Sequence, residues 1–173
     1  MAEPVVAEST RQEDADGPRT ARVVFEPGLS ASMRLADGTE VGLDTITVRA
    51  TEYTVGEDGL KAMPAELPPA SMYTYAVELS VDEAIAVGAI TVTFTKPVHL
   101  YVDNFLDVPV GMIVPVGLYD RACGCWIPSD NGRVLKVLSI DGEGRATLDV
   151  DGEDAPATPE RLVELGITDY ELA

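Results

Sequence analysis

The feature that most constrains the fold is a series of short runs in which apolar and polar residues alternate. Thr45–Tyr53 is the clearest run, and Tyr73–Val81 repeats the same period of two. In an extended strand this period puts alternate side chains on opposite faces, so that one face is buried and the other is in water. Turn-forming residues separate the runs, as at Pro27-Gly28 and Asp37-Gly38, which is typical of antiparallel strands.

About ten such strands, without strand–helix alternation, predict a mostly β chain. We expect an antiparallel β-sandwich or barrel-like module at residues 21–150, with a short C-terminal helical appendage. Residues 1–20 hold few large apolar groups, so a flexible acidic linker or tail is expected there. Residues 151–173 are expected to form an acidic turn plus short helices leading to a next domain. Thr158 can cap a helix there, Pro159 suits its first position and Gly166 suits its end.

The charge of the chain limits the partners that it can bind. There are 30 acidic and 12 basic residues, and the formal net charge is −18. This charge repels phosphate backbones and anionic lipid headgroups, so no nucleic acid is expected as a partner. No segment approaches the roughly 20 apolar residues of a membrane span, so membrane insertion is not expected either. Residues 1–18 lack the apolar core and cleavage site of a secretory signal, and any signal is expected outside this sequence.

Several longer runs occur in an order that is more specific than the composition. They resemble the segment that precedes the YD repeats in large bacterial Rhs-type proteins, and the resemblance covers about residues 21–170. The runs are Thr47–Gly56, Met63–Pro69, Tyr73–Ala84, Pro97-Val98, Tyr101–Leu106, Val114–Asp120 and Trp126–Val134.

The order Pro97-Val98, Val114–Gly117 and Trp126–Pro128 is also similar to the β-sandwich domains of ankyrins and netrin receptors.

The Rhs resemblance implies a function and a location. It implies a non-catalytic structural or interaction module of a large exported protein, placed outside the cell or on its surface. The expected partners are the other domains of that protein. The YD repeats themselves are absent from this sequence. A second hypothesis is a carbohydrate- or adhesion-type module that binds a glycan or protein ligand, with calcium assisting.

No constellation of catalytic residues stands out, and an enzyme is not expected. His99 is the only histidine, and it lies in a strand-like run where it is expected to pack or to face water. The acid pairs Asp82-Glu83 and Asp103 with Asp107 are expected to be solvated carboxylates, because acidic residues are frequent throughout the chain.

The segment from Asp149 to Glu160 is the sharpest candidate for a ligand site. Calcium takes about six to eight oxygen ligands, which a loop can supply from alternate positions. Counted from Asp149, acids stand at the first, third, fifth and twelfth positions: Asp149, Asp151, Glu153 and Glu160. Against a calcium loop, the sixth position is Asp154 where glycine is usual, and a strand precedes the segment. Two alternatives stay open: a strand-led calcium site, or a plain acidic turn.

Two further features concern aromatic and sulfur side chains. Trp126 could belong to a sugar platform, but aromatic side chains of alternating strands mostly face the core, which is the expectation here. Cys123 and Cys125 are separated by one glycine. A bridge between them would close a very small ring, and the pair could supply only half of a metal site. The expectation is two small residues in a hairpin turn, with no role assigned.

Overall fold

The computed structural model describes residues 4–56, 58–65 and 75–173, and it is mostly β, with 40% strand and 8% helix. The strand pairs are antiparallel, and the described strands form no closed barrel. The predicted fold class is therefore confirmed, including the short C-terminal helix. The chain divides into two compact units, Met1–Met63 with Tyr73–Asp103, and Pro64–Met72 with Asn104–Ala173. This division differs from the predicted module of residues 21–150.

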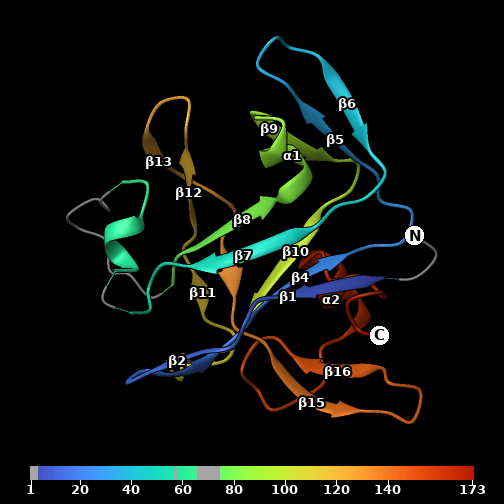
Figure 1. Ribbon diagram of the computed structural model, residues 1–173. Helices are drawn as coiled ribbons and strands as arrows, with labels where there is room; N and C mark the ends of the chain where they lie inside the picture. The colour runs from blue at the N-terminus through green and yellow to red at the C-terminus, as the bar shows by residue number, and fades with distance from the viewer. Residues whose placement is uncertain (1–3, 57, 66–74) are drawn as a thin grey trace. The chain divides into compact units, whose positions relative to one another are not determined.

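The first unit is built from small antiparallel sheets (Figure 1). In two of them a central strand has a partner on each side. β4 (Ala21–Phe25) lies between β1 (Val5–Glu8) and β10 (Val98–Val102), and β5 (Ala31–Arg34) lies between β6 (Glu40–Leu43) and β9 (Thr91–Phe94). The remaining elements are the pair β7 (Val48–Glu52) and β8 (Val77–Val81), the hairpin of β2 (Gln12–Asp14) and β3 (Gly17–Arg19), the 3-10 helix η1 (Leu60–Ala62) and the helix α1 (Asp82–Ala86).

The alternating runs predicted the positions of these strands well. Thr45–Tyr53 contains β7, and the run Tyr73–Val81 ends with β8. Tyr73 and Thr74 lie outside the described residues. The backbone N–H of Tyr53 donates to the carbonyl of Ala76 at 2.9 Å, so the ladder continues past the end of β7 and before the start of β8.

Two segments of the chain each bend once, and each contributes one strand to each of two sheets. β4 pairs with β10 and β5 pairs with β9, and residues 26–30 and 95–97 connect the pair Phe25–Val98 with the pair Ala31–Phe94. Between these pairs, the N–H of Thr95 donates to the carbonyl of Ser30 at 3.0 Å. The break predicted at Lys96-Pro97 is thus a bend between two strands, as suits a residue without an N–H donor. We call this feature the bent ribbon, residues 21–34 with 91–102.

Two clusters of buried apolar side chains form the core of the first unit. One consists of Val23, Phe25 and Leu29, and the other of Met33, Val81 and Ala84. Ile46 and Val48 pack against both clusters, so the β7 region joins them. This packing of sheets against each other is sandwich-like.

The prediction of a flexible tail at residues 1–20 is corrected for the described residues. β1 pairs with β4, and β2 pairs with β3. Arg19, at the end of β3, has only 2% of its side chain exposed and bonds two carboxylates. Its Nη2 lies 2.7 Å from Asp14 Oδ2, and its Nε lies 2.6 Å from Glu52 Oε1. The composition predicted disorder because residues 1–20 hold few large apolar groups. Composition does not reveal strand pairing or a buried ion pair, and these interactions hold the segment in place.

This cluster changes the protonation of its members. The hydrogen bond from Arg19 is the main reason why the pKa of Asp14 is lowered to about 2. Near them, burial raises the pKa of Tyr75 to about 12, and the charge of Glu52 contributes to the rise. Asp14 is therefore ionised and Tyr75 is neutral over the ordinary pH range.

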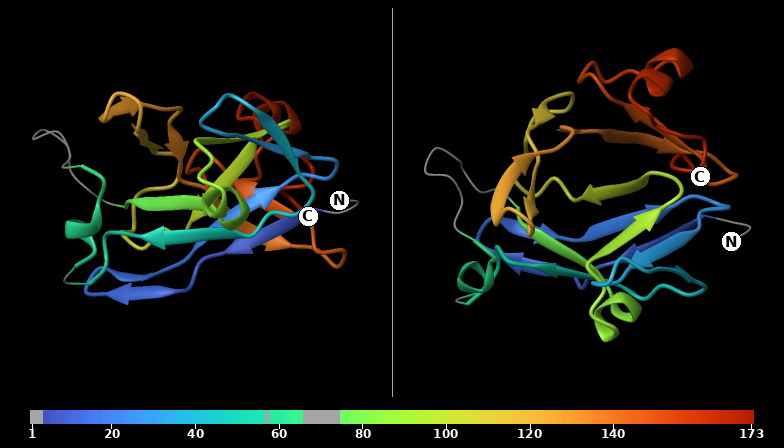
Figure 2. Two further views of the ribbon diagram at one scale, coloured as in Figure 1. Left: turned by 45° about the horizontal axis from the view of Figure 1, so that its top comes forward. Right: turned by 90° about the horizontal axis from the view of Figure 1, so that it is seen from above.

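The second unit consists of hairpins and one helix. β11 (Ile113–Val114) pairs with β14 (Gly132–Arg133), and β12 (Gly117–Asp120) pairs with β13 (Cys125–Pro128). The N–H of Ser129 donates to the carbonyl of Val116 at 2.9 Å, which joins these pairs into one irregular hairpin. β15 (Lys136–Ile140) pairs with β16 (Ala146–Asp149), and α2 (Pro159–Glu164) follows (Figure 2).

The predicted signals of the C-terminal helix are confirmed. Thr158 caps α2, because its Oγ1 accepts from the N–H of Arg161 at 3.2 Å, and Pro159 is the first helical residue. Gly166 has a positive φ of 71° just after the helix. A turn closed by the N–H of Glu171 and the carbonyl of Thr168 follows, instead of a second helix. Among the residues described, no helix has the length and apolar character needed to cross a membrane.

The Arg19 cluster gives a stability prediction with a matched control. Arg19→Leu should lower the free energy of unfolding by about 3 kcal/mol, because it leaves Glu52 buried without this cation. Arg22 also bonds two carboxylates, Glu8 and Asp103, but 38% of its side chain is exposed. Arg22→Leu should therefore cost about 1 kcal/mol or less. Urea denaturation measures both variants, and equal losses would contradict this account of the cluster.

The same cluster predicts how stability depends on acid. Because the folded pKa of Asp14 lies below its ordinary value of 3.8, the ionised carboxylate stabilises the fold above about pH 4. That stabilisation should be lost as the pH falls toward about 2. In Asp14→Asn the melting temperature should be lower at neutral pH, and it should change less between about pH 4 and pH 2 than in the parent. Asp16→Asn, in the same turn, should keep the parent's pH dependence.

Candidate functional site

The predicted calcium ligands lie around a hollow on the second unit. The loop of residues 149–158, here called the Asp149 loop, connects β16 with α2. Together with Arg161 it lines a hollow of about 250 Å³. Asp149, Asp151 and Glu153 all border this hollow, whereas Glu160 lies in the first turn of α2.

Asp149 is the anchor of the loop. It is only 2% exposed, and its two carboxylate oxygens accept hydrogen bonds from four backbone N–H groups. The donors are Asp151 at 3.0 Å, Gly152 at 2.8 Å, Glu153 at 3.3 Å and Asp154 at 2.8 Å. Burial by itself raises the pKa of this carboxyl, but the four donors outweigh it, so the pKa lies below its ordinary value. The loop is thus folded around an ionised carboxylate.

Asp151 is held by two arginines. Arg161 of α2 approaches it with two nitrogens, Nε at 3.0 Å and Nη2 at 2.8 Å, in the paired geometry that suits a carboxylate. Arg133 of β14 donates to it at 3.1 Å, and also to the carbonyls of Gly111 and Val150 at 2.9 and 3.0 Å. Arg161 is the main cause of the lowered pKa of Asp151. These contacts tie the loop to the helix and to the hairpin.

Two glycines let the Asp149 loop touch the segment before β11. Gly111 and Gly152 both have positive φ, 84° and 82°. A Cβ on Gly111 would lie 2.7 Å from the carbonyl oxygen of Asp151, and one on Gly152 would lie 2.6 Å from that of Val110. At both positions the conformation and the space suit only glycine.

The carboxylates of this segment differ in their contacts. The oxygens of Asp149 and Asp151 are bonded to backbone amides and arginines, and Glu153 and Glu160 are exposed. Within residues 4–56, 58–65 and 75–173, no three His, Cys, Asp or Glu side chains are grouped so that they could hold a metal ion. Calcium binding at Asp149, Asp151, Glu153 and Glu160 stays a prediction.

The other acidic candidates also hold local structure. Asp82 binds the guanidinium of Arg49 with both oxygens, at 2.6 and 2.7 Å. Glu83 accepts hydrogen bonds from the backbone N–H and the hydroxyl of Thr47, each at 2.8 Å. Asp103 accepts from Arg22 and from the N–H of Thr20, whereas Asp107 belongs to the second unit.

His99 lies half-buried in β10. Its Nε2 is 3.7 Å from Oε1 of Glu26. The sequence predicts that this histidine packs in a strand or faces water, and the structure places it in β10 with its side chain partly exposed.

The hairpin of β12 and β13 corrects one prediction. Cys123 lies in its turn and Cys125 begins β13, and the two form a disulfide, which the argument from ring size had disfavoured. The turn places their Cα atoms 5.3 Å apart, a separation that disulfides commonly span. Beside them, Trp126 is half-buried, and its ring packs edge-on against Tyr119 with centroids 5.4 Å apart.

Sequence reasoning missed the residues that organise the Asp149 loop. Arg133, Arg161 and Gly111 had no role assigned, although they connect the loop to its surroundings. The available signal was the scarcity of cations: in a chain with 12 basic residues, arginines near an acidic segment are candidates for ion pairs. The contact between Arg133 and Asp151 could not be predicted from the sequence, because the two residues are far apart along the chain.

The geometry predicts the effect of removing the anchor charge. Asp149→Asn should lower the melting temperature by several degrees. In the variant an amide NH₂ replaces one carboxylate oxygen, and the backbone N–H that this oxygen accepts from in the parent loses its acceptor. The loss should be the same in calcium and in chelator. Glu153→Gln, in the same loop but exposed, is the control and should melt like the parent. A loss that occurs only with calcium present would instead support a calcium ligand.

Comparisons of this chain with protein-family models, with curated proteins and with solved structures found no match.

Proposed function

We propose that this chain is a non-catalytic interaction module whose partners are other domains of a large exported protein of the Rhs/YD-repeat type. The ordered runs from Thr47–Gly56 to Trp126–Val134 support the family, and the antiparallel β architecture agrees with the fold that the resemblance implies. The observation that carries the interaction role is the surface of the second unit.

In the described part of the second unit few large apolar side chains are fully buried, and many are exposed to water. Val150 and Leu172 are its buried hydrophobic residues, whereas Ile140 is 66% and Val163 is 76% exposed. Burial of apolar surface is the main favourable contribution to folding and to association. A surface with so many exposed aliphatic side chains is typical of one that another protein surface covers.

The strand β15 is the best-defined part of this surface. Val137 and Ile140 are both more than half exposed on it, and the register between β15 and β16 shifts between Val137 and Ser139. Asp141 and Glu143 follow in the turn of the hairpin. The partner surface that fits best is apolar at its centre and basic around it, which also suits the net charge of −18.

The roles of the carboxylates support the non-catalytic part of the proposal. Asp82, Glu83, Asp103, Asp149 and Asp151 each bond an arginine, a threonine or backbone amides. The bonds of Asp149 fold its own loop, and those of the other four carboxylates link separate segments of the chain, which are structural tasks.

Radical footprinting tests the proposal. The chain is oxidised by hydroxyl radicals alone and within the complete reading frame that encodes it. We expect Val137, Ile140 and Val163 to be oxidised several-fold less in the longer protein, because neighbouring domains cover them. Ile85 on α1 of the first unit, which is 62% exposed, is the internal reference for radical dose. Equal oxidation in both samples, or a reading frame without neighbouring domains, would contradict the proposal.

A further inference from the structure

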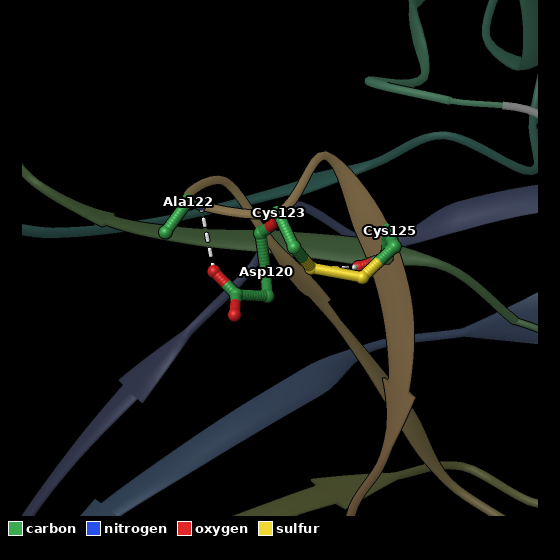
Figure 3. The surroundings of a disulfide bond; sticks show 4 residues. All are labelled: Asp120, Ala122, Cys123 and Cys125. Carbon is green, nitrogen blue, oxygen red and sulfur yellow. Dashed lines mark hydrogen bonds between the residues drawn. A yellow bond between two sulfur atoms is a disulfide. The ribbon is translucent and has the colours of Figure 1, made fainter.

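The disulfide between Cys123 and Cys125 lies at the tip of an exposed hairpin. The tip residues 121–125 are all exposed to solvent. Figure 3 shows the bridge beside Asp120, whose Oδ1 accepts from the N–H of Ala122 at 2.7 Å. A thiol in solution can therefore reach the bridge.

The bridge contributes little to the stability of the fold. A disulfide stabilises a fold mainly by restricting the unfolded chain, and this effect grows with the length of the loop that it closes. Here the loop encloses only Gly124, so the effect is near its minimum. In addition, backbone pairing from Gly117–Pro128 to Asp120–Cys125 and the packing of Tyr119 against Trp126 already hold the hairpin.

The hairpin also keeps the two sulfur atoms near each other without the bond. The N–H of Gly124 donates to the carbonyl of Asp120 at 2.9 Å, and Cys125 is paired with Asp120 across the strands. These interactions do not involve the sulfur atoms. After reduction the two thiols therefore remain close enough to form the bond again.

We propose that Cys123 and Cys125 form a thiol–disulfide exchange site that accepts electrons from a thiol or dithiol in solution. Exposed disulfides have more oxidising potentials than buried structural ones and are the ones that exchange. This inference is independent of the proposed interaction role, which concerns the apolar surface of the same unit.

The exchange proceeds in two balanced steps. A thiolate of the substrate attacks the Sγ of Cys123 or Cys125, the Sγ–Sγ bond breaks, and the other cysteine leaves as a thiolate that takes a proton from water. A second substrate thiolate then attacks the substrate sulfur of this mixed disulfide. The products are a substrate disulfide and two cysteine thiols, so two electrons pass from the substrate to the bridge.

Glutathione at defined ratios of thiol to disulfide is the probe. The folded chain is equilibrated with each mixture, quenched in acid and alkylated. Mass spectrometry of the intact protein then gives the fractions of bridge, mixed disulfide and dithiol. We expect reversible conversion between bridge and dithiol within the range that glutathione mixtures cover. The emission maximum of Trp126, the single tryptophan, should stay the same in both forms because the hairpin is retained.

Two variants make the result specific. Cys125→Ser leaves Cys123 without a second thiol, so it should accumulate one bound glutathione that the parent releases. The double variant Cys123→Ser with Cys125→Ser should show no mass change. A bridge that glutathione reduces only after denaturation would overturn the proposal. So would a shift of the Trp126 emission to that of the unfolded chain on reduction, because the bridge would then be a staple.

Discussion

The buried guanidinium of Arg19 is the interaction on which the first unit most depends. Its bonds to Asp14 and Glu52 join the β2–β3 hairpin to β7. Withdrawing a charge from water costs roughly several kcal/mol, and only well-placed partners offset this cost. In a chain with an excess of acids, partners for an arginine are plentiful, so the positions of the few cations decide which segments are drawn together.

The second unit also depends on a buried charge, but here the charge is negative. The carboxylate of Asp149 is withdrawn from water, and four backbone amides of its own loop replace the lost hydration. Arg133 and Arg161 then connect the adjacent Asp151 to β14 and to α2. Few apolar residues of this unit are fully buried, so these polar contacts are an important part of what holds its loop in place.

The sequence allowed prediction of what depends on neighbours in the chain. The alternation in Thr45–Tyr53, the turn at Asp37-Gly38 and the cap at Thr158 are local patterns, and the structure contains the corresponding elements. The fold of residues 4–20, the partners of each strand and the two-unit division depend on contacts between distant residues, such as Arg19 with Glu52. At the candidate site, the acidic loop was found, but its arginine partners and the Cys123–Cys125 bridge were not, because spacing alone does not reveal side-chain geometry.

The bent ribbon has a consequence for how the first unit opens. Since residues 21–34 and 91–102 contribute strands to two sheets, and Ile46 and Val48 touch both apolar clusters, neither sheet has a boundary along which it can separate alone. Local opening usually follows such boundaries, and a region without them exchanges its amide hydrogens only through its largest fluctuation. We therefore expect the first unit to open as a single foldon, in which its two small cores melt together.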